Sequence, residues 1–312
     1  MTAEPAEYRI NHTTSYQYDD AISLGYNRAY LTPRETPWQH TRFTRVVVAP
    51  HPAVTSRRTD YFGNVQTLWT LQERHERLTI TATSRVSLKP RPAADLAASP
   101  PWEAIRALVH ADRSPEVLEA LEQVFDSPMA RSSPALRAYA GESFKPGRPV
   151  LAAARELTRR IFKDFAYKPD VTTVTTAPDE ALALRAGVCQ DFAHVAIAAM
   201  RGLGLPARYV SGYLRTLPPP GKPKLRGADA SHAWFSVYGG KAAGWVDFDP
   251  TNDCVPGLDH ITLAWGRDFG DVSPARGVVL GAGTQALSVA VDVTPVTRGR
   301  GHDAEPDAPG IE

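Results

Sequence analysis

Cysteine is scarce in this chain: Cys189 and Cys254 are the only two among 312 residues. Two cysteines at this length cannot build the disulfide framework of small secreted domains. No stretch has the roughly 18 uninterrupted apolar residues of a membrane-spanning helix, and the N-terminus lacks the charged and then apolar pattern of a signal peptide. We therefore expect a cytoplasmic location and no membrane partner.

An excess of either charge is also missing. The chain carries 35 Lys and Arg against 34 Asp and Glu, a formal net charge of +1. Because no basic excess is present, a nucleic-acid partner is not expected. Hydrophobic residues make up 43% of the chain, enough for substantial cores. A length of 312 residues is about twice that of a common domain, so two domains are predicted.

The first 90 residues have the sequence patterns of β-strands, and the spacing of apolar residues changes to a helical one after them. Short runs rich in β-branched and aromatic residues predict strands over 8–18, 43–48, 65–71 and 78–88, which favours a sandwich or a twisted antiparallel sheet. A proline-rich segment follows at 89–101. Beyond it, apolar spacing predicts helices over 102–110, 115–125 and 150–164, then strands over 207–213, 233–238, 244–248 and 286–293.

One cysteine lies where a helix is predicted to begin. Residues 187–194 read Gly-Val-Cys-Gln-Asp-Phe-Ala-His and lead into an apolar helix. A thiol in the first helical turn faces unpaired backbone N–H groups and the positive end of the helix dipole, which favours the thiolate. Cys189 is therefore a candidate nucleophile. Cys254 has no such context and is expected to pack structurally, His194 is expected to pack on the helix, and Asp191 is expected to cap it.

A histidine and two aspartates follow in the motifs Ser231-His-Ala-Trp234 and Asp247-Phe-Asp-Pro250. Both motifs lie on predicted neighbouring strands joined by a glycine-rich hairpin, and cross-strand Cβ atoms are about 5 Å apart. His232 could thus take the proton of a thiol while a carboxylate fixes its tautomer. We favour Asp249 as that carboxylate; Asp247, two residues earlier on the same strand and face, competes for the role.

These strings resemble a known family. GVCQDFAH, RGLGLPARYVSGYL, SHAWFSVY and GWVDFDPTN are similar, in this order, to the transglutaminase-like core, and the flanking YRINHTTSYQY and DYFGN resemble the N-terminal domain of its bacterial members. The resemblance implies an α+β fold: a β-rich, sandwich-like domain, then a papain-like core whose cysteine-bearing helix packs on an antiparallel sheet. We accordingly divide the chain into a β-rich domain (1–90), a proline-rich linker with helices (91–149), a catalytic core with a C-terminal strand extension (150–295) and a disordered tail (296–312).

The resemblance also implies roles. It places the nucleophile at Cys189, the histidine at His232 and the aspartate at Asp249. It implies a peptide or protein substrate attacked at a peptide or glutamine-type amide, and a thioester resolved by water or by an amine acceptor. A cysteine peptidase or amidase without transferase activity, or a non-catalytic binding module on the same fold, are the alternatives. No cofactor or metal is expected. No calcium loop of the EF-hand kind occurs, so calcium dependence is not carried over from the family.

Overall fold

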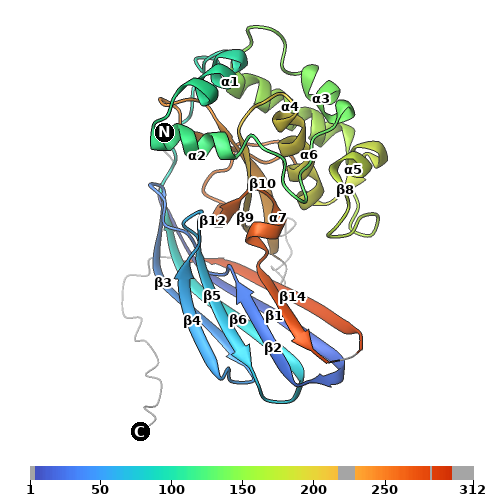
Figure 1. The fold of residues 1–312 in the computed structure, drawn as a ribbon. Helices are drawn as coiled ribbons and strands as arrows, with labels where there is room; N and C mark the ends of the chain where they lie inside the picture. The colour runs from blue at the N-terminus through green and yellow to red at the C-terminus, as the bar shows by residue number, and fades with distance from the viewer. Residues whose placement is uncertain (1–3, 217–228, 282, 297–312) are drawn as a thin grey trace, which may run out of the picture.

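The computed structural model describes residues 4–216, 229–281 and 283–296. Figure 1 shows three parts: a β domain at one end, a helical layer at the other, and a smaller sheet between them. The predicted disordered tail lies, from residue 297 onward, outside the described residues.

Two four-stranded antiparallel sheets form the β domain. They have the orders β14-β1-β6-β3 and β13-β2-β5-β4. Their strands are β1 (Ala6–Ile22), β2 (Leu24–Ala29), β3 (Gln39–Ala49), β4 (Val54–Thr59), β5 (Val65–Leu71), β6 (His75–Leu88), β13 (Ala275–Leu280) and β14 (Gln285–Pro295). Alternation explains their packing, because Leu78, Ile80 and Ala82 of β6 are buried and form one cluster with Trp69 and Leu71 of β5.

The last two strands correct the predicted domain boundaries. The strand extension assigned to the core at 150–295 instead returns to the β domain, where β14 pairs with β1 from Tyr8 opposite Pro295 to Tyr18 opposite Gln285. β13 likewise pairs with β2. Without these partners, β1 and β2 would be edge strands with unpaired backbone groups. Val293 is fully buried in a cluster that also contains residues of the central sheet.

The helical layer consists of α1 (Trp102–Ala111), α2 (Pro115–Glu122), α3 (Pro134–Gly141), α4 (Val150–Asp164), α5 (Pro178–Leu184) and α6 (Cys189–Arg201). Val109, Val117 and Leu136 of the first three helices share one core with Leu157 of α4 and Ala196 of α6. The region predicted as a linker with helices (91–149) is therefore part of the helical layer from residue 102 onward. Helices α1, α2 and α3 each have an apolar face, and each face must be buried against a neighbouring element, so these helices pack into the helical layer.

The central sheet has the order β11-β10-β9-β12. Its strands are β9 (Ala207–Leu214), β10 (Ala230–Tyr238), β11 (Trp245–Phe248) and β12 (His260–Gly266), followed by the short helix α7 (Phe269–Val272). Helix α6, buried from Asp191 to Arg201, packs on β9 and β10. This confirms the predicted α+β fold with a cysteine-bearing helix on an antiparallel sheet.

No helix among the described residues is long and apolar enough to cross a membrane; the longest, α4, has 15 residues. The cytoplasmic location stays a prediction.

Candidate active site

Cys189 is the first residue of α6, and Asp191 holds the start of that helix. Oδ2 of Asp191 accepts hydrogen bonds from the backbone N–H of Val188 at 2.8 Å and from the hydroxyl of Thr172 at 2.7 Å. Asp191 is thus the cap that the sequence predicts. The thiol of Cys189 lies in the first turn, beside backbone N–H groups that have no partner within the helix.

Gly187 makes this helix start possible. Its φ is +156°, and a Cβ at this position would lie only 2.5 Å from Oδ2 of Asp191 and 2.9 Å from its Cβ. Any larger residue would therefore displace the capping carboxylate. The backbone carbonyl of Gly187 also accepts the N–H of Lys168 at 2.9 Å, through the short parallel pair of β7 (Ala166–Tyr167) and β8 (Ala186–Gly187).

The three residues predicted for catalysis come together. His232, on β10, places Nε2 2.8 Å from Oδ2 of Asp249, and its imidazole is close enough to the thiol of Cys189 for that thiol to raise the pKa of His232. Burial lowers the pKa of His232, but the hydrogen bonds to Asp249 and Cys189 and the attraction to both raise it by more, to about 10. The site therefore favours a protonated imidazole beside the sulfur at neutral pH.

Asp249 is fully buried, and both of its carboxylate oxygens accept several hydrogen bonds. Oδ1 accepts the backbone N–H groups of Thr251 and Asn252 at 2.8 and 3.2 Å. Oδ2 accepts His232, the side-chain amide of Asn252 at 2.7 Å and Nε2 of His260 at 3.0 Å. Burial alone would raise the pKa of Asp249, but the hydrogen bonds from both histidines lower it well below its usual range. The carboxylate thus stays ionised.

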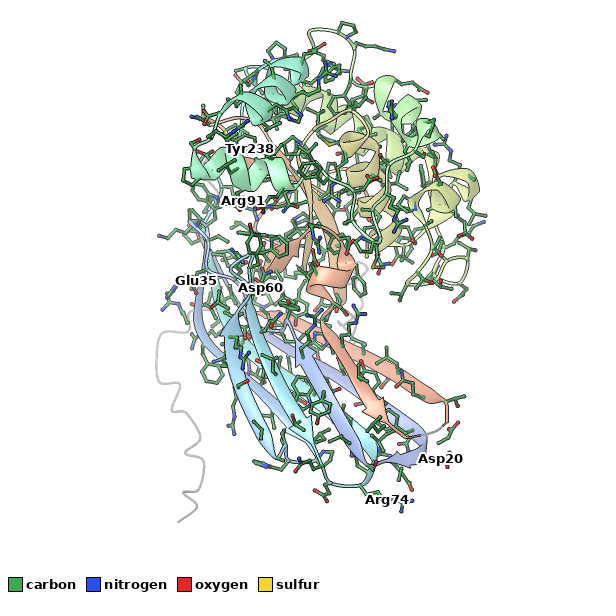
Figure 2. All side chains as sticks on the ribbon, viewed as in Figure 1. Asp20, Glu35, Asp60, Arg74, Arg91 and Tyr238 are labelled. Atoms are coloured by element: carbon green, nitrogen blue, oxygen red, sulfur yellow. The ribbon has the colours of Figure 1, made fainter. Side chains whose placement is uncertain are left out.

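Asp247 has a different partner. Its Oδ2 lies 2.6 Å from a guanidinium nitrogen of Arg91, which Figure 2 places at the junction of the β domain and the upper layer. The predicted cross-strand relation also needs a correction. The register pairs Phe235 with Phe248, so Asp249 follows opposite Trp234 and meets His232 diagonally rather than directly.

Two site residues, Asn252 and His260, were not predicted. Asn252 lies in the Asp-Pro-Thr-Asn string, where an aspartate that accepts backbone N–H groups two and three residues later is a local signal. His260 has no local signal, because β12 brings it to the site by pairing with β9. His194 accepts the backbone N–H of Phe269 at 3.2 Å, in agreement with its predicted packing role.

His232, Asp249 and His260 also form a trio in which each residue has one potential metal-binding atom within 4.8 Å of the others. Nε2 of His232 and Nε2 of His260 are both already used in hydrogen bonds to Oδ2 of Asp249. The amide of Asn252 also lies within 3.3 Å of Nε2 of His232. We therefore describe the trio as a hydrogen-bonded network and assign it no metal.

The fold and this geometry define an α+β protein with a cysteine, a histidine and an aspartate gathered at one helix start. Comparison with known proteins agrees. Residues 8–87 match the bacterial transglutaminase-like N-terminal region, and residues 137–250 match the transglutaminase-like superfamily. The chain belongs to this superfamily.

Three similar proteins illustrate the relationship. An uncharacterized protein of Mycobacterium tuberculosis is 41% identical, over 92% of each chain. The protein-glutamine gamma-glutamyltransferase of Pseudomonas aeruginosa is 33% identical over 128 residues, which are 40% of this chain and 19% of that protein. The crystal structure of a candidate cysteine protease from Cytophaga hutchinsonii shares the fold, with a TM-score of 0.75 at 22% identity, over 96% of this chain and 93% of that chain.

Proposed function

We propose that this protein is a cysteine acyl-transfer enzyme that acts on amide bonds through a thioester. The single observation that carries the proposal is that Nε2 of His232 lies 2.8 Å from the buried carboxylate of Asp249 while the same imidazole is close enough to the Cys189 thiol for that thiol to raise the pKa of His232. A thiol needs a base within reach, and the base needs a group that fixes its tautomer. All three groups are present at this site.

The reaction follows from these contacts. His232 takes the proton of Cys189, and the thiolate attacks the carbonyl carbon of the amide. The backbone N–H of Cys189, at the start of α6, is one donor for the developing oxyanion. When the intermediate collapses, the C–N bond breaks and His232 returns its proton to the departing ammonia or amine. Water or an amine then attacks the thioester carbonyl and loses a proton to His232. The C–S bond breaks, a carboxylic acid or a new amide is released, and the sulfur takes the proton back from His232.

The name of the Pseudomonas aeruginosa relative supports a glutamine-type amide as the substrate and an amine as the acceptor. Hydrolysis of the same thioester is the cysteine peptidase or amidase alternative, and it shares the whole first half-reaction. A purely binding role accounts less well for the site, because a buried, ionised aspartate that is paired with two histidines and has a lowered pKa is typical of functional sites.

Intact-mass analysis tests the proposal. The protein is incubated with a glutamine-containing peptide and methylamine, and both the protein and the peptide are weighed. We expect an acyl adduct on the protein, release of ammonia, and a peptide carrying either methylamine or a new carboxylate. The first product signals transamidation and the second hydrolysis.

Two variants locate the reacting thiol. Cys189→Ala should abolish both the adduct and the turnover, and Cys254→Ala, which removes the other half-buried thiol, should retain both. Turnover that survives in Cys189→Ala would overturn the proposal. So would a wild-type protein that forms no adduct with the peptide.

A further inference from the structure

His260 is a second imidazole on the carboxylate that holds His232. Its Nε2 lies 3.0 Å from Oδ2 of Asp249, the same oxygen that faces Nε2 of His232 at 2.8 Å. His260 is the first residue of β12, pairs with Leu214 of β9, and is only 5% exposed. A buried histidine in this place has no part in the proton transfers described above.

The surroundings of Nδ1, the other ring nitrogen of His260, indicate which nitrogen carries the proton. Nδ1 is buried and has no hydrogen-bond partner among the described residues. A proton on that nitrogen would be a buried donor without an acceptor, which is costly. The ring is therefore neutral, carries its proton on Nε2 and donates it to Asp249. Its ring packs nearly perpendicular to that of Trp234, with ring centres 5.4 Å apart.

Groups other than His260 also orient the carboxylate of Asp249. Oδ1 of Asp249 is held by the backbone N–H groups of Thr251 and Asn252, and the amide of Asn252 reaches Oδ2. What His260 changes is the strength of the hydrogen bond between Oδ2 of Asp249 and His232. An oxygen that accepts a further N–H donor has less negative charge available for each of the others.

We propose that His260 is a neutral positioning residue that shares Oδ2 of Asp249 with His232 and thereby weakens the hold of Asp249 on the proton of His232. A base that must return its proton to the leaving amine benefits from this, because a proton held too tightly is released slowly. That benefit rests on the proposed function. The sharing of the oxygen does not, and it can be measured on the free protein.

Other charged groups near the pair are accounted for. The thiol of Cys189, on α6, raises the pKa of His232. Burial raises the pKa of the Cys254 thiol to about 12, so it stays neutral beside Asp249. The remaining acids on this side of the site are paired, Asp253 with Arg155 and Asp259 with Arg215. A change in the titration of His232 after substitution of His260 can thus be assigned to Asp249.

NMR titration of histidine side chains in the isotope-labelled full chain tests the proposal, with the His232 signal assigned from its absence in His232→Gln. His260→Phe keeps a ring against Trp234 and removes the N–H donor. We expect the midpoint of His232 to rise by about half a unit or more in His260→Phe. His260→Gln, which can still donate an N–H, should stay close to the wild type.

An unchanged or lower titration midpoint of His232 in a folded His260→Phe variant would overturn the proposal. Loss of structural support alone would weaken the contact between His232 and Asp249 and so lower that midpoint. If His260→Phe does not fold, the wild-type spectrum decides the question. His260 should show one protonated nitrogen, Nε2, throughout the neutral range. Protonation of both nitrogens at neutral pH would overturn the proposal equally. If His260→Phe loses acyl transfer while the titration midpoint of His232 is unchanged, the proposed role of His260 is wrong and the proposed function is unaffected.

Discussion

Asp247 and Asp249 lie two residues apart, yet their carboxylates bind different partners: the first binds Arg91 at 2.6 Å and the second binds His232 at 2.8 Å. The strand ends at Phe248, and the chain beyond it turns so that the backbone of Asp249 pairs with that of Cys254. Asp249 thus lies where the strand passes into this turn, on the same face as His232.

The two aspartates should therefore respond differently to the same substitution. Asp249→Asn leaves His232 without a charged acceptor and should lower turnover by about 10³- to 10⁴-fold. Asp247→Asn should leave turnover nearly unchanged and lower the free energy of unfolding by about 1–3 kcal/mol, through its weakened hydrogen bond to Arg91. Steady-state kinetics and urea denaturation on both variants measure this. Equal losses of turnover would contradict the assignment.

The two cysteines should differ in reactivity although both are half-buried. Burial, and then the charge of Asp249, raise the pKa of Cys254 to about 12, so almost none of it is thiolate at neutral pH. Cys189 instead lies in the first turn of α6, close to His232. We expect iodoacetamide to label Cys189 at least about 100-fold faster, as measured by peptide mass mapping. Cys254→Ala should label like the wild type, and similar rates at both thiols would argue against an activated Cys189.

Gly187→Ala should disturb the start of α6. The added Cβ would meet Oδ2 of Asp191 at 2.5 Å, so either the cap or the backbone must move. We expect a loss of about 2 kcal/mol in the free energy of unfolding and slower alkylation of Cys189. Gly141→Ala is the matched control, because nothing lies within 4 Å of its added Cβ. An alanine at 187 that changes neither quantity would show that the cap does not need this glycine.

Stability should fall as the pH rises from neutral. Burial lowers the pKa of His232, but its partners raise it above 6.5 to about 10 in the folded chain. The stabilisation is thus complete below about pH 6.5 and is lost as the pH approaches 10, because the folded state binds the proton more tightly than the unfolded state. Urea denaturation of wild type and His232→Gln between about pH 6 and pH 9.5 should show a difference that shrinks with pH. His51→Gln, at an exposed position, is the control, and a constant difference would contradict the raised pKa.

How far the sequence predicts this protein depends on the range of each interaction. Alternation at Leu78 and Ile80 indicates a strand, and the pattern around Cys189 indicates a helix start, because both signals are local. Convergence of Cys189, His232 and Asp249 could be predicted from the motifs. The return of β14 to β1 could not, since it joins residues such as Tyr8 and Pro295 from opposite ends of the sequence. The place of His260 depends on long-range pairing in the same way.

The pairing of β14 with β1 also constrains how the protein can be made. Because the chain emerges from the ribosome N-terminus first, β1 emerges long before its partner strand β14 has been synthesised. Until β13 and β14 follow the helical layer, β1 and β2 each lack one partner strand and leave backbone groups unpaired at the edge of their sheets. Such distant contacts form slowly and leave apolar strands open to wrong partners. We therefore expect the nascent chain to need protection from aggregation until residues near 295 emerge.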